Sequence, residues 1–247
     1  MLLYLPRFYV RDVEANIARL HSELDAAAAG CGIIVFPEQF ITGYRAACEP
    51  LRLHDEFTAG SARQPELLCI FGTVTEEGRN RQWAYRDGQP LAHYDKVHLF
   101  EPNLEHELWQ SGARYVALTH GGLTIGLATC NDVRFPEQAR ALKLQLGIQM
   151  MIYPALWPWQ RDHVWRALLQ ARAIENGVFC IGCCVAGVDN GLERFDGAGN
   201  YVFDPLGEPV YAQGCVYNLD EQRLGAVTVD TRAQYREVTQ VELVEEP

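Results

Sequence analysis

The chain has 247 residues, of which 48% are apolar and 21% are charged, and its formal net charge at pH 7 is −11. This composition supports a large hydrophobic core and excludes an intrinsically disordered chain. An acidic chain is also not expected to bind nucleic acid, which requires a basic face. No segment has the run of about eighteen uncharged apolar residues that a membrane-spanning helix needs. Residues 1–7 lack the basic start of a signal peptide.

Eight cysteines are too few for a disulfide scaffold in a chain of this length, and most of them lie inside apolar runs. This usage is typical of reduced thiols and predicts a cytoplasmic protein. Cys180 and Cys183 have the spacing of half a metal site. A strand would place them on opposite faces, and no second pair with zinc-type spacing follows. We therefore expect buried thiols there and no metal.

Helical and strand patterns alternate along the first half of the chain. Apolar residues at helical spacing predict a helix over 12–29, and the continuous apolar run 31–36 predicts a strand buried on both faces. Residues 45–65 are mixed and polar, which favours a loop or a short irregular helix. A strand is expected over 67–74. Two hairpins are expected, one around Asp87-Gly88 (81–86 with 90–94) and one around Gly121-Gly122 (115–119 with 123–129).

The second half continues in the same way. It predicts a helix over 137–146, a buried strand over 148–153 closed by Pro154, and an amphipathic helix over 162–176 that Asn176-Gly177 ends. Further strands are expected over 178–185, 201–203, 210–211, 215–219 and 226–229. Residues 231–247 form an acidic tail. No repeat, linker or domain boundary is visible, so we expect a single α/β domain (1–247) with two sheets and helices outside both.

Cys130 is placed where a strand changes into a helix. Period-two alternation puts it at the end of a face of small residues, opposite Leu123, Ile125 and Leu127, and this predicts free space over the thiol. Pro136-Glu137 suits the first turn of the following helix. A cysteine at such a turn is accessible to chemistry, although most free cysteines are simply buried thiols.

Three separated segments then align with a known family. They are Phe36-Pro37-Glu38, the run Tyr94-Asp95-Lys96-Val97-His98-Leu99-Phe100, and the run Cys130-Asn131-Asp132-Val133-Arg134-Phe135-Pro136-Glu137. Together they resemble the glutamate, lysine and cysteine motifs of the nitrilase (carbon–nitrogen hydrolase) superfamily. The resemblance implies a four-layer αββα sandwich, a homodimer or higher homo-oligomer formed through the helical face, and no metal or organic cofactor. It also implies that Glu105 matches the additional glutamate of the family.

The resemblance gives these residues roles in a cysteine-dependent hydrolysis. Glu38 is the expected general base for the Cys130 thiol, because the thiolate is the nucleophile. Lys96 is the expected oxyanion donor, together with the backbone N–H of Asn131. Glu105 would help keep Lys96 protonated. The alternatives are a solvated carboxylate at Glu38, a surface lysine paired with Asp95, and an exposed Glu105 in an acidic loop; His98 and His106 are expected to be structural.

The finer pattern is most similar to the omega-amidases and related Nit-type amidases, which act on small carboxylate-bearing amides. We expect Asn131, Arg134 and Trp157 to contact the substrate, and Arg134 offers a planar, bidentate grip for a carboxylate. A structural arginine paired with Asp132 or Glu137 is equally compatible with the sequence. The shortened segment around 45–66 and Asn131, in place of the more frequent aromatic, leave the substrate open. Alternatives are an amidase for an N-carbamoyl or other amide, and a non-catalytic binding scaffold.

Overall fold

Two β-sheets form the centre of the molecule. The computed structural model describes residues 1–27, 30–44, 48–189 and 194–227. The strands of the first sheet are β1 (Leu2–Tyr4), β3 (Ile33–Phe36), β4 (Leu68–Glu76), β5 (Arg79–Arg86), β6 (Gln89–Asp95), β14 (Ala212–Gln213) and β15 (Val216–Asn218). The strands of the second are β7 (Val116–His120), β8 (Leu123–Leu127), β9 (Met150–Ala155), β10 (Phe179–Cys184) and β13 (Tyr201–Phe203).

Strand order follows from the pairing. The first sheet runs β14-β15-β1-β3-β4-β5-β6 and the second runs β13-β10-β9-β8-β7. Parallel pairs lie at the centre of each sheet (β1 with β3, β3 with β4, β8 with β9, β9 with β10), and antiparallel strands complete the edges. A third, small sheet joins β2 (Tyr9–Val10), β11 (Gly187–Asp189) and β12 (Arg194–Asp196).

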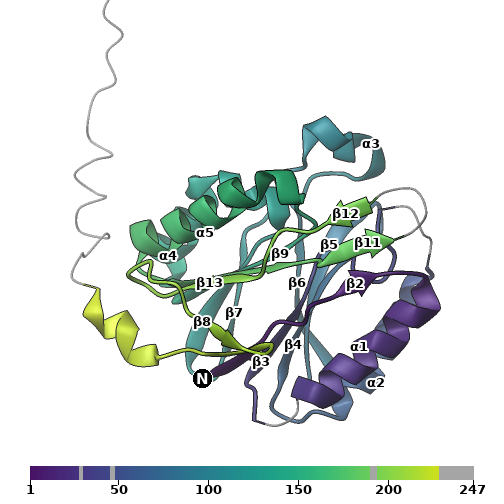
Figure 1. Cartoon of the computed structure of the whole chain (residues 1–247), viewed down its shortest axis with the longest axis horizontal. Helices are drawn as coiled ribbons and strands as arrows, with labels where there is room; N and C mark the ends of the chain where they lie inside the picture. Colours follow the sequence, from purple (N-terminus) through teal and green to yellow (C-terminus); the bar gives the residue numbers. More distant parts are fainter. Residues whose placement is uncertain (28–29, 45–47, 190–193, 228–247) are drawn as a thin grey trace, which may run out of the picture.

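Helices cover the outer face of each sheet. The α-helices are α1 (Val13–Ala27), α2 (Pro50–Ala62), the one-turn α3 (Glu105–Leu108), α4 (Pro136–Leu146) and α5 (Asp162–Asn176). Four 3₁₀ turns are η1 (Glu101–Asn103), η2 (Cys130–Arg134), η3 (Trp159–Arg161) and η4 (Glu221–Ala226). Helices α1 and α2 lie on one side of the strands and α4 and α5 on the other (Figure 1), with α2 against β4 and α5 against β10. The predicted αββα layering is confirmed.

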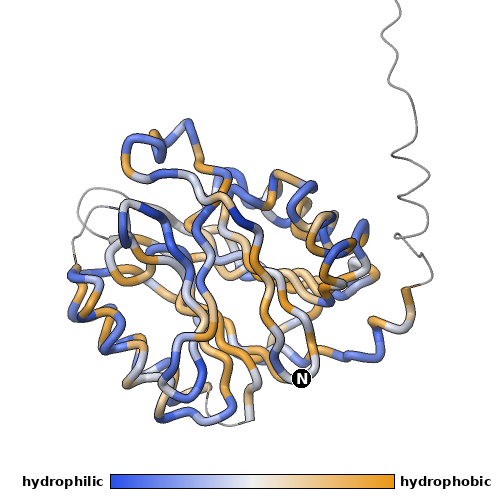
Figure 2. The backbone as a smooth tube through the Cα atoms, turned by 180° about the vertical axis from the view of Figure 1, so that it is seen from behind, coloured by the Kyte–Doolittle hydropathy of each residue, from blue (hydrophilic) through white to orange (hydrophobic). Residues whose placement is uncertain are grey.

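Apolar side chains fill the space between the sheets. Leu3, Ile33, Val35, Leu68 and Ile70 from the first sheet meet the inner face of the second, formed by Leu123, Ile125, Leu127, Met150, Ile152, Phe179 and Ile181. Hydrophobic residues run along the central strands, while the helices alternate between hydrophilic and hydrophobic residues (Figure 2). Burial of this amount of apolar surface is the main force that holds the two sheets together. None of the described helices is long and apolar enough to cross a bilayer.

Several predicted elements agree closely with the structure. The helix over 162–176 and the strand over 201–203 have the predicted bounds. Both glycine-containing hairpins form, with positive φ at Asp87, Gly88, Gly121 and Gly122, as tight hairpin turns require. Cys180 and Cys183 point to opposite faces of β10, one toward the helices and the other between the sheets.

Other predictions were wrong. Residues 50–62 form a regular helix that begins at Pro50. The helix was not predicted because its buried face is narrow and the rest of the segment is polar. The buried residues are Leu53, Phe57, Gly60 and Ser61. Strand β9 does not stop before Pro154 but includes it and ends at Ala155, because the proline pairs with Cys183 near the strand end.

The chain after residue 209 also differs from the prediction. The strand expected at 210–211 lies two residues later, at Ala212–Gln213. Residue 226, where a strand was expected over 226–229, ends a 3₁₀ turn instead. Residues 228–229 of that expected strand and the acidic tail 231–247 lie outside the described residues, as do 28–29 at the end of the first predicted helix.

The expected free space over the small face of β8 is also not there. A Cβ added to Gly126 would lie 2.3 Å from the sulfur of Met151 and 3.1 Å from Leu142 of α4. The small residues therefore let α4 and β9 pack closely against β8. Space for a substrate has to come from the turn after the strand.

Candidate active site

The residues predicted to be catalytic follow the carboxyl ends of three strands. Glu38 comes two residues after β3, Lys96 directly after β6, and Cys130 three residues after β8. Strand β6 runs in the same direction as β3, because two antiparallel pairings (β4 with β5, β5 with β6) restore the direction. The carboxyl ends of parallel strands are the usual place for a site in an open α/β sheet. The structure thus brings together residues up to 92 positions apart in the chain.

Cys130 has a strained backbone at the first position of the turn η2. Its φ is +47°, a conformation that non-glycine residues rarely adopt and that costs on the order of 1–3 kcal/mol. The Asp132 N–H donates to the Thr129 carbonyl at 2.9 Å and closes the turn. The fully buried Asp132 carboxylate accepts hydrogen bonds from the Thr129 N–H (2.8 Å), the Tyr94 hydroxyl (2.8 Å) and the His98 N–H (2.9 Å). This one carboxylate ties the turn to the segment after Lys96 and holds the strained residue in place.

Lys96 is buried between two carboxylates. Its ammonium lies 2.9 Å from Oε1 of Glu38 and 3.0 Å from Oε1 of Glu105, and the side chains are 0% (Lys96, Glu38) and 1% (Glu105) exposed. Burial alone would lower the pKa of Lys96, but the charges of Glu38, Cys130 and Glu105 raise it above its usual value. The lysine is therefore charged at neutral pH. Two of its three protons are used by the carboxylates, which leaves one donor for a substrate oxygen.

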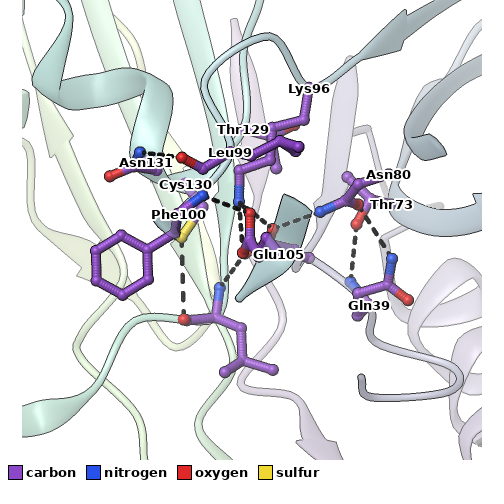
Figure 3. A network of polar contacts seen from close by, with 12 residues as sticks. Gln39, Thr73, Asn80, Lys96, Leu99, Phe100, Glu105, Thr129, Cys130 and Asn131 are labelled. Atoms are coloured by element: carbon purple, nitrogen blue, oxygen red, sulfur yellow. Dashed lines mark hydrogen bonds and ion pairs between the residues drawn. The ribbon is translucent and has the colours of Figure 1, made fainter. Parts of the chain in front are cut away.

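Glu38 is held from three directions. Its Oε1 accepts a hydrogen bond from the Asn80 amide (2.8 Å) as well as from Lys96, and its Oε2 accepts one from the backbone N–H of Leu156 (2.9 Å). Behind it, the Gln39 amide donates to Asn80 at 3.0 Å. Figure 3 shows Cys130, Glu105 and Asn80 gathered around this set of polar contacts. Glu38 is fully buried, so the alternative of a solvated carboxylate is excluded.

The Cys130 thiol lies beside this cluster and is 6% exposed. Its pKa is raised well above the ordinary cysteine value, first by burial and then by the charge of Glu38, while Lys96 acts in the opposite direction. At neutral pH the sulfur is therefore protonated in the resting enzyme. The thiol donates a hydrogen bond to the Leu156 carbonyl at 3.9 Å, and the N–H of the same residue donates to Glu38 at 2.9 Å. Attack on a substrate requires that this proton leaves, and Glu38 is the acceptor that the sequence predicts for it.

Glu105 is the third member of the cluster. It begins the short helix α3 and accepts hydrogen bonds from the Tyr44 hydroxyl (3.0 Å) and the Phe100 N–H (2.8 Å) in addition to Lys96. Burial raises its pKa, the ammonium of Lys96 lowers it, and the charge of Glu38 raises it further, with a net upward shift. The alternative of an exposed loop acid is excluded. Likewise Asp95, the other candidate partner of Lys96, pairs with Arg81 at 2.6 Å.

The predicted substrate contacts are placed as follows. The Asn131 amide donates to the carbonyls of His98 (3.1 Å) and Leu99 (3.2 Å), so this side chain braces the lysine segment, and its Oδ1 is buried without a partner. Arg134 makes neither of the predicted ion pairs to Asp132 or Glu137 among the described residues; its guanidinium stacks on the Trp157 ring at 4.7 Å. Trp157 is 3% exposed and supports Arg134 from below.

Several site residues gave no signal in the sequence. Asn80 and Tyr44 lie on a hairpin and a loop with no catalytic spacing, and Arg161 is one arginine of an ordinary polar stretch. They contribute through contacts that only the fold creates: Asn80 on Glu38, Tyr44 on Glu105, and Arg161 over the Phe100 ring at 5.2 Å. Within the described parts of the chain, the histidines, cysteines and acids form no group of three or more that could hold a metal ion.

Known proteins are similar to this chain in sequence. The carbon–nitrogen hydrolase family profile matches residues 4–234. Omega-amidase YafV from Escherichia coli strain K12 is 34% identical over 205 residues, which cover 80% of this chain and 78% of that protein. The 2-oxoglutaramate amidase of Bacillus subtilis strain 168 is 28% identical over 210 residues, covering 81% of this chain and 80% of that protein.

Solved structures give the same result for the fold. The crystal structure of XC1258 from Xanthomonas campestris, a CN-hydrolase superfamily protein with an arsenic adduct in its active site, is 25% identical. It superposes with a TM-score of 0.80 and covers 100% of this chain and 99% of that chain. The chain therefore belongs to the carbon–nitrogen hydrolase family, within the nitrilase superfamily, and is a hydrolase that acts on carbon–nitrogen bonds.

Proposed function

We propose that this enzyme hydrolyses a small carboxylate-bearing amide to the carboxylic acid and ammonia through a thioester on Cys130. The observation that carries the proposal is the dry cluster of Glu38, Lys96 and Glu105 beside a cysteine held at positive φ. The relatives named omega-amidase and 2-oxoglutaramate amidase support an amide of this class as the substrate.

The first half-reaction forms the thioester. The Cys130 sulfur attacks the amide carbon while its proton passes to Glu38, and the former carbonyl oxygen becomes an oxyanion. The free N–H of Lys96 and the backbone N–H of Asn131 receive that oxyanion; Asn131 lies in the first turn of η2, where N–H groups have no partner within the helix. One such donor contributes about 10²–10³-fold to the rate. The carbon–nitrogen bond then breaks, and Glu38 returns the proton to the leaving ammonia.

The second half-reaction releases the acid. Water takes the place that ammonia leaves, Glu38 removes one of its protons, and the hydroxide oxygen attacks the thioester carbon. The same two donors hold the second oxyanion. The carbon–sulfur bond breaks, the sulfur recovers a proton from Glu38, and the carboxylic acid departs. Every step uses groups of this chain.

Arg134 is the proposed contact for the substrate carboxylate. It ends the same short turn that Cys130 begins, so its guanidinium and the sulfur are carried by one rigid element. The Trp157 ring beneath it fixes the guanidinium plane. A planar fork of this kind matches the two oxygens of a carboxylate.

An acid-quench experiment tests the thioester. The protein is mixed with succinamate, quenched in acid within the first turnovers, digested and analysed by mass spectrometry. We expect the succinyl mass on the peptide that contains Cys130 in the wild type, and no such mass in Cys130→Ala. An acyl group found on another cysteine, or ammonia release in the Cys130→Ala variant, would contradict the mechanism.

Two broader parts of the proposal concern the whole protein. We propose a cytoplasmic location, because all eight cysteines lie within the described residues and are free thiols.

We also propose a homodimer through the face of α5. Ile174 on this helix is 55% exposed, and Leu206 beside it is 42% exposed. Light scattering after gel filtration tests the dimer: a monomer at micromolar concentration would exclude it.

A further inference from the structure

Two arginines in the active-site region have no anionic partner among the described residues. Arg134 stacks on Trp157 and Arg161 on Phe100, with 4.7 Å and 5.2 Å between the guanidinium carbon and the ring centre. The Nε atom of each guanidinium is buried and has no hydrogen-bond partner. A buried donor without a partner carries a free-energy penalty, which a ligand that accepts the hydrogen bond removes.

The fold places the two arginines at the same end of the second sheet. Arg134 ends the turn η2 after strand β8, and Arg161 ends the turn η3 after the neighbouring parallel strand β9. Trp157 connects them, because its ring lies under Arg134 and its indole N–H donates to the Arg161 carbonyl at 2.9 Å. Phe100, under Arg161, is the residue whose N–H holds Glu105. Both arginines are thereby fixed to the walls of the catalytic cluster.

The electrostatics of the pair favour an anion between them. The pKa of Arg134 is lowered from its usual value first by burial and then by the positive charge of Arg161, while the charge of Cys130 raises it. The two cations therefore repel each other, and Arg134 is near enough to the sulfur to interact with its thiolate form. The free enzyme thus holds two positive guanidiniums whose Nε–H groups have no hydrogen-bond acceptor, which is unfavourable. An anionic ligand would offset the repulsion and accept these hydrogen bonds.

We propose that Arg161 is a specificity-determining residue that forms, with Arg134, a two-arginine clamp for the carboxylate of the substrate. The inference rests on the proposed amide hydrolysis for the position of the scissile bond, and it extends that proposal from one arginine to a pair. The substrate class that fits is the monoamide of a short dicarboxylic acid, in which the free carboxylate occupies the clamp and the amide carbon reaches Cys130. The dicarboxylate product fits the same clamp.

Steady-state ammonia release from succinamate and from butanamide, a neutral analogue with a methyl group in place of the carboxylate, by wild type and Arg161→Gln, tests the clamp. We expect KM for succinamate to rise at least about tenfold in the variant, with kcat changed by less than about threefold, because a uniform binding interaction is lost. The kinetics with butanamide should not change. Arg161→Lys keeps the positive charge but lacks the planar guanidinium. Its KM for succinamate should therefore lie between those of wild type and Arg161→Gln.

Arg166→Gln is the matched control. Arg166 also lies over an aromatic ring, that of Tyr201 at 5.9 Å, but it is exposed on helix α5 and away from the cluster. It should behave as wild type with both substrates. A loss of rate with butanamide as large as with succinamate in Arg161→Gln would mean a purely structural role and would overturn the clamp.

Calorimetric titration with glutarate separates this inference from the proposed function, since binding needs no turnover. Wild type should bind glutarate at least about tenfold more tightly than Arg161→Gln does. Arg161-dependent glutarate binding by a protein that releases no ammonia would support the clamp and contradict the hydrolase. Normal ammonia release with unchanged KM and unchanged glutarate affinity in Arg161→Gln would overturn the clamp and leave the hydrolase standing.

Discussion

Replacing Glu105 by glutamine tests how the buried cluster works. Oε1 of Glu105 accepts from Lys96 and Tyr44, and Oε2 accepts from the Phe100 N–H. A glutamine has one acceptor oxygen, so its amide NH₂ must face at least one of these donors. A donor left unpaired in a dry site costs about 1–3 kcal/mol, and the ion pair with Lys96 is lost as well. The variant should therefore lose roughly that much stability in urea unfolding.

Two opposite effects then act on the rate. Loss of the Glu105 charge makes Lys96 a stronger partner for an oxyanion and lowers the pKa of Cys130, since Glu105 raises it in the wild type. Loss of the bracing hydrogen bonds misplaces the ammonium, which as the proposed oxyanion donor contributes about 10²–10³-fold to the rate. We expect the positional effect to dominate, with kcat for succinamate reduced about 100-fold, which corresponds to about 2.7 kcal/mol. KM should stay within about threefold, because Glu105 does not touch the carboxylate.

The assay is ammonia release coupled to glutamate dehydrogenase, with Glu107→Gln as the matched control. Glu107 lies on the same helix α3 but is exposed, so its replacement removes an equal charge without touching the cluster. Its kcat should be within about twofold of wild type, as surface changes generally have small effects. If Glu105→Gln slows the reaction no more than Glu107→Gln does, the bracing role of Glu105 is wrong.

Three further predictions concern stability. Burial raises the pKa of five thiols (Cys69, Cys130, Cys180, Cys183 and Cys184), so the unfolded chain releases these protons above about pH 8.5 while the folded chain keeps them. Stability should be full at pH 7 and fall above about pH 9, by up to about 1.4 kcal/mol per pH unit for each thiol, and equal urea midpoints at pH 7 and pH 10 would contradict this. Asp132→Asn removes the charge that accepts three hydrogen bonds at the Cys130 turn and should lower the free energy of unfolding by about 3 kcal/mol; the exposed Asp25→Asn, within about 0.5 kcal/mol of wild type, is its control. Gly182→Ala would place a Cβ 2.3 Å from Leu169 and 2.6 Å from Trp165 and should lower stability by about 1–3 kcal/mol, whereas Gly225→Ala has no atom within 4 Å and should be near neutral.

Regular elements with a full apolar stripe were predictable from the sequence. Helix α5 has its apolar residues at helical spacing, and Gly177 after it adopts the left-handed conformation that ends a helix. Helix α2 was missed because its buried stripe is narrow and its other positions are polar. Strand β9 was cut short because proline generally ends a strand, but here it is accommodated near the end.

The site was predictable only where chemistry forces a residue type. A nucleophile, a base and a fixed cation need cysteine, carboxylate and lysine, so Cys130, Glu38 and Lys96 could be named from their motifs. Their supports have no such requirement. Asn80 and the backbone of Leu156 reach Glu38 because β5 begins and β9 ends beside it, and Arg161 lies near Arg134 because β8 and β9 are neighbours. Contacts of this kind depend on the tertiary structure and cannot be predicted from the spacing of residues in the sequence.

The central claim is that Cys130 hydrolyses a carboxylate-bearing amide, and ammonia release tests it most directly. Succinamate and 2-oxoglutaramate are each offered to the wild type and to Cys130→Ala, with butanamide and an N-carbamoyl amino acid as comparison substrates. We predict rapid ammonia release from the two carboxylate-bearing amides, much slower release from the comparison substrates, and a loss of at least about 10⁴-fold in Cys130→Ala. Turnover that survives in Cys130→Ala, or a wild type that releases ammonia only from the comparison substrates, would contradict the account.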